Sequence, residues 1–313
     1  MKTGKMRRVG KTNEGLFNSE SAASTVIAAV LLLSIIFTIF AVVRIAYVPE
    51  WKNDAEQLHM SKVNKDMAEL KSSADMIILL QSSNSSSDKF HFSIPSINVP
   101  VSMGGGELPI FDTSKSSGAL SVNTEPCIVT ITTEEGNKIS INSGTITYSS
   151  NNNQYVDQVF RYENGAIILA QGKRSLMTQF PSLFRIKKTG EYEYDVWIQA
   201  INISGNSDTI SSDSDTSLRL TGSPQNITYL GNTSSFDYNI TTKYPDAWES
   251  YLKGNQNEIA NEESLEYGTD FILKSNDLDN ISLEFFAKSQ NHYSIYVSES
   301  GFKAEIGAKN SFY

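Results

Sequence analysis

The stretch SESAASTVIAAVLLLSIIFTIFAVVRIAYV, residues 19–48, organises the rest of this chain. Within it, the 22 residues from 22 to 43 carry no charge. As an α-helix rising about 1.5 Å per residue they form a rod of roughly 33 Å, which is enough to cross the hydrocarbon core of a bilayer. The sequence therefore predicts a transmembrane helix over residues 16–48 and a single-pass membrane protein.

Charges on the two flanks of this span predict its orientation. All charged residues at positions 1–11, before the span, are basic, whereas the flank after the span contains charged residues of both signs. Because basic flanks stay in the cytoplasm, we expect a cytoplasmic N-terminus and an extracellular location for the bulk of the chain. The two flanks contain Lys2, Lys5, Arg7, Arg8 and Lys11, and Glu50, Lys52, Asp54 and Glu56, respectively.

Charge and cysteine content limit the partners of the outward part. The 313-residue chain has a net charge of -9, but its first 49 residues hold six of the 26 basic residues and only two of the 35 acidic ones, so the remainder is near -13. This balance argues against a nucleic-acid partner. Cys127 is the only cysteine, so no intrachain disulfide can form, and its apolar neighbours predict a buried, inert thiol.

A short polar segment precedes the apolar run and reads Glu14-Gly15-Leu16-Phe17-Asn18-Ser19-Glu20. It resembles the class III signal of type IV prepilins and archaeal pilins. The resemblance implies that a prepilin-type peptidase removes the basic leader, residues 1–15, on the cytoplasmic side and leaves the apolar helix on the mature protein. Leu16 then becomes the N-terminus, and Glu20 becomes the fifth mature residue, where many family members have glutamate.

Glu20 has two interpretations. A carboxylate beside a membrane segment is costly unless it is paired, and in a filament the amine of a neighbouring subunit would pair it. The alternative is an uncleaved signal anchor in which Glu20 is a polar interfacial residue. Glu14 stands where archaeal members usually have a basic or small residue, which leaves this alternative open.

A second helical pattern follows the span over residues 49–83. Apolar residues recur there at spacings of mostly three and four, which is typical of an amphipathic helix. Its stripe needs a partner, either the protein's own outer domain or the helices of adjacent subunits. In pilin-like proteins a joined rod of this kind forms the filament core. The stripe consists of Leu58, Val63, Met67, Leu70, Ala74, Ile77 and Ile78.

Aromatic, proline and serine residues predict where this rod meets the interface, bends and ends. Tyr47 and Trp51 mark the membrane interface, as amphipathic rings do. Pro49 lacks a backbone donor and should kink the helix. The helix should end near Gln81, before a serine-rich polar hinge over residues 84–89.

Residues 90–313 predict a β-rich head of one domain or two subdomains. Asn164-Gly165 between two apolar runs predicts a tight hairpin, residues 204–217 a Ser/Asp-rich loop, and residues 246–253 a short helix. The fold class is therefore α+β, a long N-terminal helix followed by an antiparallel β-sandwich-like head. Strands are predicted at 90–94, 128–132, 138–141, 145–148, 155–162, 166–171, 191–202, 218–220, 227–230, 235–240, 271–274, 281–287 and 293–297.

One block of the head carries a second resemblance. It is similar to the middle of large uncharacterised archaeal surface proteins that bear pilin-type N-termini, which implies a β-sandwich head on a pilin-like helix. The block consists of Gly144-Thr145-Ile146-Thr147-Tyr148, Tyr162-Glu163-Asn164-Gly165-Ala166, and then Gln171, Ser175, Met177, Phe180, Pro181 and Ser182.

Six N-x-S/T sequons lie after the span, five of them beyond residue 200. Their joint placement predicts a glycosylated exterior face, which would leave the helix and the proximal β face for assembly. The candidate asparagines are Asn84, Asn202, Asn226, Asn232, Asn239 and Asn280.

Residue types that carry chemistry lack catalytic or metal-binding spacing. His59, His91 and His292 have no HExxH-like partners, which favours satisfied surface or core histidines. The glycine run 104–106 lacks the Lys-Ser/Thr of a phosphate loop and predicts a flexible loop.

Three aspartates in the serine-rich loop, Asp208, Asp213 and Asp215, offer oxygens for Ca²⁺, but no glycine or distal glutamate completes an EF-hand. A solvated hairpin tip explains them better. We therefore expect no catalytic residue, no metal, no cofactor and no enzymatic activity.

Two functions fit these patterns. The first is a structural or adhesive subunit of a type IV pilus-like assembly, with the bilayer, a prepilin-type peptidase and pilin-like subunits as partners. The alternative is a permanently anchored module that binds a carbohydrate or an envelope-layer protein. Tyr192, Tyr194 and Trp197 are its candidate residues, although core packing explains them more simply. A third function, an anchored hydrolase, has no motif in its support.

Overall fold

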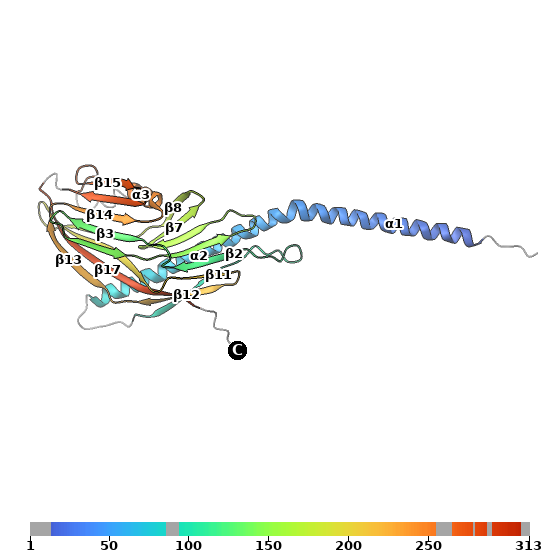
Figure 1. Ribbon diagram of the computed structural model, residues 1–313, viewed down its shortest axis with the longest axis horizontal. Coiled ribbons are helices and arrows are strands. Elements are labelled where there is room, and N and C mark those ends of the chain that lie inside the picture. The colour runs from blue at the N-terminus through green and yellow to red at the C-terminus, as the bar shows by residue number, and fades with distance from the viewer. Residues whose placement is uncertain (1–13, 86–93, 255–264, 278, 287–289, 308–313) are drawn as a thin grey trace, which may run out of the picture.

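The computed structural model describes residues 14–85, 94–254, 265–277, 279–286 and 290–307. It shows one long N-terminal helical rod followed by a β-rich head, which confirms the predicted α+β class (Figure 1). The first part of the rod protrudes from the head, and the second part lies along the head's strands.

Three consecutive helical segments make up the rod: α1 (Glu14–Val42), a π-helical turn η1 (Val43–Tyr47) and α2 (Val48–Ser85). The N–H of Val48 donates to the carbonyl of Val43, five residues back. Because Pro49 has no N–H, the irregularity expected there takes the form of this π turn directly before it.

The C-terminal end of the rod lies later than the sequence pattern indicates. α2 continues to Ser85 rather than ending near Gln81, so residues 84 and 85 of the predicted hinge are helical. Residues 86–89 of that hinge lie outside the described residues.

The head contains three sheets, which we name the central, helix-side and distal sheets. The central sheet has the order β1 (Ser96–Val101), β12 (Thr216–Gly222), β17 (His292–Gly307), β10 (Glu193–Ser204), β9 (Phe184–Lys188), with β13 (Asn226–Thr233) also on β17. The helix-side sheet has the order β11 (Asp208–Ser212), β2 (Ser117–Val122), β5 (Ile146–Asn151), β6 (Val159–Glu163), β7 (Ala166–Gln171), β8 (Arg174–Gln179). The distal sheet has the order β15 (Phe271–Asp277), β16 (Asn280–Phe285), β14 (Phe236–Thr241), β3 (Ile128–Thr133), β4 (Lys138–Asn142).

Two hydrophobic cores lie on opposite faces of the central sheet. Strand β10 contributes side chains to both cores, because successive residues of a strand point to opposite faces of the sheet. Its even-numbered residues from Tyr194 to Ala200 face the first core, with the distal sheet and the short helix α3 (Pro245–Gly254). Ile201 and Ile203 face the second core, in which α2 packs between the central and helix-side sheets.

The Asn164-Gly165 turn lies where these two cores meet. Both residues have positive φ, +42° and +83°, as the predicted tight hairpin between β6 and β7 requires. The turn is buried: the Asn164 side chain accepts the N–H of Ile201 at 2.9 Å and donates to the Tyr238 hydroxyl at 3.2 Å. It therefore ties the helix-side sheet to the other two sheets.

Several strands differ from the sequence-based prediction. Residues 208–212 form the edge strand β11 within the predicted loop, and β17 extends ten residues beyond the predicted end at Val297. The prediction lacks strands β1, β2, β8 and β9, because each is at most six residues long and mixes polar residues, Pro100 or Gly118 with its apolar residues. Pairing with neighbours defines them. The long pair β10 and β17 is parallel, so the head is not purely antiparallel. Residues 90–93 of the first predicted strand lie outside the described residues.

We predict that Gly165→Ala destabilises the protein more than Gly172→Ala does. Both glycines have positive φ, but a Cβ at Gly165 would lie 3.0 Å from Ile201 and 3.3 Å from Pro181, whereas at Gly172 it would meet nothing within 4 Å. We expect losses of about 2–4 and about 1–2 kcal/mol, respectively. Urea denaturation of the full chain in micelles measures both, and equal losses would contradict the buried position of the turn.

Candidate functional site

The described side chains of α1 are exposed on every side. From Val26 to Val42 the exposed fraction of its large apolar residues lies between 49% (Phe40) and 64% (Phe37). In the middle of the helix the hydroxyls of Ser34 and Thr38 donate to carbonyls four residues back, both at 2.8 Å. By length and composition the helix can cross a membrane, and a helix that is apolar all round belongs in lipid or inside an assembly.

The protein's own head covers the apolar stripe of α2. Val63, Met67, Leu70 and Ala74 are fully buried in the second core. Of the two partners considered for the stripe, the outer domain is therefore the one observed. Leu58 was wrongly placed in the stripe: it is 72% exposed and lies on the outer face of the helix.

Polar side chains on the buried face of α2 fix the helix to the loops of the head. Nearest α1, the ammonium of Lys52 donates to the Asp112 carboxylate at 2.8 Å and to the Ser114 hydroxyl at 2.5 Å. The hydrogen bond from Lys52, together with those that the hydroxyl and N–H of Ser114 donate, holds the pKa of Asp112 well below its ordinary value. Further along, Asp66 accepts the N–H of Ser102 at 2.8 Å.

Glu56 makes the most extensive of these contacts. Its fully buried carboxylate accepts the consecutive backbone N–H groups of Asn153, Gln154 and Tyr155 at 2.9, 2.8 and 2.7 Å. Gly106, at φ +77°, passes so close that an added Cβ would lie 2.4 Å from Glu56. One charge thus satisfies three donors of a turn that would otherwise lack partners.

His59 lies one turn further along the same face. The Tyr148 hydroxyl donates to the Met103 carbonyl at 3.1 Å, which leaves its oxygen to accept from His59 Nε2 at 3.3 Å. Gly105 packs directly over the imidazole. Gly105 and Gly106 therefore let this loop approach α2 closely, whereas Gly104 lies against Asp213 and Ser116. Burial, together with the charge of Lys62, lowers the pKa of His59.

The residues of the predicted processing site lie at the start of α1. Gly15, Leu16 and Glu20 are helical in their backbone, and their side-chain surroundings lie outside the described structure. Removal of the predicted leader, residues 1–15, therefore stays a prediction.

The sequon asparagines are spread over the head. Asn226 and Asn232 are exposed on β13, while Asn239 and Asn280 are half-buried in the distal sheet. Asn202 is also half-buried, and its amide nitrogen, the atom that a glycan would modify, donates to Glu299 at 2.8 Å. The side chain of Asn84 lies outside the described residues.

A row of rings crosses the open face of the central sheet beyond the end of α2. Trp197 on β10 stacks on Tyr296 on β17 with centroids 4.4 Å apart and planes at 12°, and Tyr229 on β13 follows at 5.0 Å. The guanidinium of Arg185 lies 5.4 Å from the other face of Trp197. The faces of Trp197 are therefore occupied within the row.

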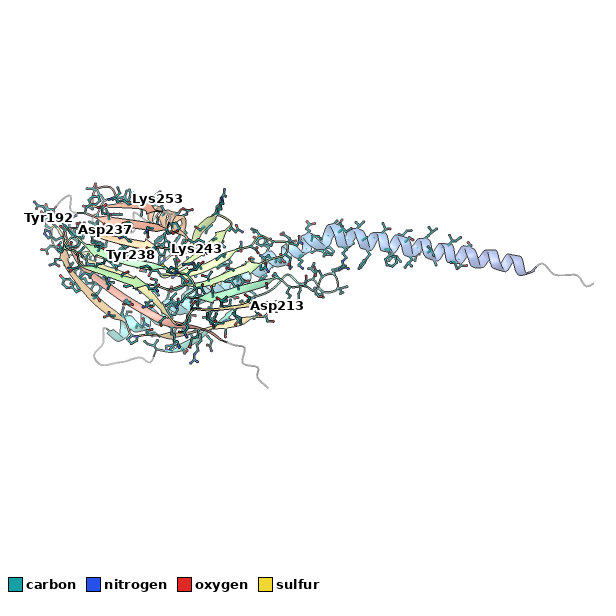
Figure 2. All side chains as sticks on the ribbon, in the orientation of Figure 1. Tyr192, Asp213, Asp237, Tyr238, Lys243 and Lys253 are labelled. Carbon is teal, nitrogen blue, oxygen red and sulfur yellow. The ribbon has the colours of Figure 1, made fainter. Side chains whose placement is uncertain are left out.

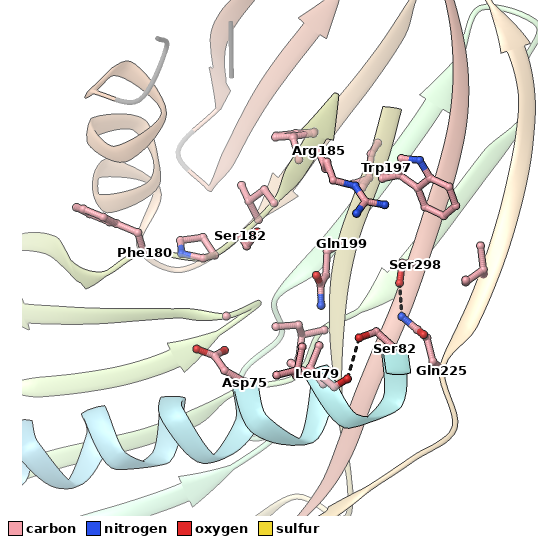
Figure 3. A pocket seen from close by; sticks show the side chains of 18 of the residues that line it. Asp75, Leu79, Ser82, Phe180, Ser182, Arg185, Trp197, Gln199, Gln225 and Ser298 are labelled. Atoms are coloured by element: carbon pink, nitrogen blue, oxygen red, sulfur yellow. Dashed lines mark hydrogen bonds between the residues drawn. The ribbon is translucent and has the colours of Figure 1, made fainter. Parts of the chain in front are cut away.

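A cleft of about 880 Å³ separates this row from the end of α2 (Figure 3). Its walls mix apolar and polar side chains, including Phe180, Gln199 and Asp75, and Gln225 donates to Ser298 at 2.6 Å on its floor. Of the three aromatic candidates, Trp197 alone lines this cleft.

The other two aromatic candidates lie elsewhere. Tyr194 is buried in the first core beside Tyr293, so core packing does explain it. Tyr192 is exposed at the end of the head far from α1 (Figure 2). The structure therefore does not bring the three rings into one site.

The structure contains a buried ion network that the sequence analysis did not predict. The fully buried guanidinium of Arg161 donates to Glu163 at 2.6 Å and to Glu125. Glu163 also accepts the indole N–H of Trp248 at 2.7 Å and the Thr242 hydroxyl at 2.5 Å. An Arg-x-Glu pattern within a strand places both charged side chains on the same face of the sheet, and this spacing could have indicated the ion pair from the sequence. Arg161 and Glu163 are fully buried and Glu125 is half-buried, so the network joins the sheets rather than offering a reactive group.

Partial burial opposes ionisation of Glu125 at the edge of this network. The hydrogen bond from Lys243 and the charge of Arg161 outweigh that effect and lower the pKa of Glu125. Nearby, Cys127 is fully buried, which confirms its predicted burial, and burial raises its pKa well above the ordinary value.

The predicted metal candidates stay apart. Asp208 begins β11, and Asp215 faces Lys62 at 3.8 Å. Asp213 lies at the end of the head that faces α1 (Figure 2). Within the described ranges no group of three acidic, histidine or cysteine side chains is arranged to hold a metal ion. His59 is the buried histidine described above, His292 is exposed, and His91 lies outside the described residues.

One apolar N-terminal helix followed by a β-rich head fits the class of single-pass, membrane-anchored proteins. Residues 114–277 match a family of unknown function, DUF7289, and the chain belongs to this family. The match runs from just before β2 to the end of β15 and does not include the rod. No curated protein matches the chain, and no solved structure matches it.

We predict that Glu56→Gln lowers the free energy of unfolding by about 2–3 kcal/mol, because the amide presents one oxygen to three backbone donors and adds an N–H₂ beside them. Glu69→Gln on the exposed face of α2 is the matched control and should stay within about 0.5 kcal/mol of wild type. Urea denaturation of the full chain in micelles provides the measurement. Equal effects would show that the three contacts contribute nothing to stability.

We predict a pH dependence that originates at His59. Its folded-state pKa lies below the ordinary 6.5, so the unfolded chain binds the proton first as the pH falls. His59 therefore stabilises the neutral-pH fold, and this contribution is lost as the pH drops below about 6.5. His59→Gln should show a flatter decline in thermal midpoint between pH 7 and pH 5, and parallel profiles would contradict the assignment.

Proposed function

We propose that this protein is a pilin-like cell-surface subunit, anchored by α1 and displaying its β-rich head outside the cell. Its role would be structural or adhesive within a type IV pilus-like assembly, without catalysis. The observation that supports this most is the continuity of the rod, whose first part is exposed on all sides and whose second part is built into the core of the head.

A rigid joint matters for an assembly more than for a tether. A flexible linker is sufficient to hold a binding module near a membrane. Here the helix passes from the apolar segment to the second core without a break other than η1. Lys52 and Glu56 fix it to the head within about three turns of η1. The position of α1 against its neighbours would therefore set the position of the head.

The start of α1 supplies the remaining parts of the proposal. Removal of residues 1–15 by a prepilin-type peptidase would leave Leu16 as the new N-terminus. Glu20 would then be neutralised by the amine of an adjacent subunit when α1 packs into an assembly. The basic leader favours a cytoplasmic N-terminus, and the exposed sequons Asn226 and Asn232 suit an outward-facing head.

A second candidate function is a permanently anchored binding module. The cleft at the end of α2 supports it, since clefts of this size with a few polar groups commonly hold ligands. The row of rings beside the cleft is a weaker argument for a sugar, because Trp197 is stacked between Tyr296 and Arg185.

We predict that the protein isolated from its native membrane begins at Leu16, because a prepilin-type peptidase cuts after Gly15. Gly15→Val should retain Met1, whereas the matched leader substitution Gly10→Val should still give Leu16. Mass spectrometry of the intact N-terminus distinguishes these outcomes. Met1 in the wild-type protein would refute the processing proposal.

Shearing of cells then separates the two candidate functions. An assembled subunit appears in the sedimentable fibre fraction, whereas a tethered module stays with the membrane. Glu20→Gln should deplete the fibre fraction without changing the amount in the membrane. An absence of wild-type protein from fibres would favour the anchored module.

A further inference from the structure

The loop between β1 and β2 presents an unusual apolar tip. Ile110 is 89% exposed, more than any other large apolar side chain among the described residues. Its φ is +78°, a conformation that β-branched residues rarely adopt. Exposure and backbone strain are both unfavourable in a water-soluble loop, and they coincide at one residue. Strain of this kind concentrates at functional positions.

The loop is held firmly despite this tip. Leu108 and Asp112 exchange two backbone hydrogen bonds, of 2.7 and 3.0 Å, on either side of it. Lys115 and Glu107 pair across its base at 3.3 Å, and Lys52 of α2 binds Asp112. The tip is therefore a fixed projection.

The projection lies at the end of the head from which α1 emerges. The ring of Phe111 lies 5.6 Å from that of Trp51, and Trp51 lies 6.0 Å from Tyr47. In Figure 1 the green loop beside β2 extends past the head in the direction of α1. The tip and the C-terminal end of the apolar helix therefore lie at the same end of the head.

The axial position of these rings matches a membrane interface. Trp51 is eight residues beyond Val43, the last residue of the uncharged span, which is about 12 Å along a helix. Residues 45–48 are also apolar, so Tyr47 and Trp51 fall where the hydrocarbon gives way to headgroups. Aromatic rings concentrate at that depth.

We propose that residues 109–111 are a second membrane contact, in which Ile110 inserts into the outer interface of the bilayer beside Tyr47, Trp51 and Phe111. The surrounding exposed charges include Glu50, Asp54 and Glu107, so the contact relies on apolar insertion and not on anionic lipid. Together with α1 it gives the head two points of attachment and fixes its rotation about the rod. This inference rests on the proposed membrane anchoring.

Site-directed spin labelling tests the contact in the full chain. Because Cys127 is fully buried, an introduced Ile110→Cys can be labelled selectively without removing it. The labelled protein is reconstituted in dioleoylphosphatidylcholine vesicles, and collisions with oxygen and with a water-soluble nickel chelate are compared. Ile227→Cys, exposed on β13 beside the end of α2 that is remote from α1, is the aqueous control. Ser34→Cys, in the middle of α1, is the membrane control.

We expect the oxygen-to-nickel ratio at position 110 to be several-fold higher than at 227 and lower than at 34. A ratio at 110 equal to that at 227, with 34 shielded, overturns the contact while leaving the anchor intact. A water-accessible label at 34 instead refutes membrane anchoring and the contact with it. Shielding of 110 only in sheared fibres would assign the tip to a neighbouring subunit and overturn the proposal.

Ile110→Gly separates the membrane role from a folding role. Removing the side chain relieves the strain at φ +78°, so the thermal midpoint in micelles should not fall. A lower midpoint would show that Ile110 supports the fold of the loop and would contradict the proposal.

Discussion

The burial of α2 between the central and helix-side sheets is the interaction on which the other features depend. Its apolar side chains fill the second core, and Lys52, Glu56 and Asp66 satisfy donors and acceptors of two loops, β1–β2 and β5–β6. A buried charge is tolerated only when it is paired or fully hydrogen-bonded, so each contact fixes both the helix and its loop. Since α2 continues directly from α1, the apolar segment and the head form one body.

The central sheet distributes this constraint through the head. Strands β10 and β17 serve the first core with one face and the second core with the other, so neither core is complete without them. The last described strand, β17, pairs with β10, β12 and β13. Such non-local pairing implies that the head closes only when its C-terminal strand is in place. Asn164 and the Arg161 network then tie the helix-side sheet to its neighbours.

The two ends of α2 carry different surfaces. At its start lie the projecting loop, the interfacial rings and the polar contacts of Lys52 and Glu56. At its end lie the cleft and the row formed by Arg185, Trp197 and Tyr296. The first surface suits the proposed contact with a bilayer because Ile110 and the interfacial rings adjoin the apolar span. The second is mixed in polarity and lies at the end of α2 that is remote from the apolar span, which suits the approach of a ligand or subunit.

Local sequence determined the elements whose pattern is self-sufficient: the apolar span, the amphipathic helix, the Asn164-Gly165 hairpin and the alternating strands of the head. It also determined that Cys127 would be an inert core residue. The partner of the α2 stripe, strands such as β2 and β11, the opposite placement of Tyr194 and Trp197, and the function of the glycine run 104–106 could not be read from local patterns. Each depends on which distant segment packs against it, because pairing, burial and close approach are properties of contacts and not of single segments. Ile110 belongs to the same group, since its strain and exposure exist only in the folded loop beside the start of α2.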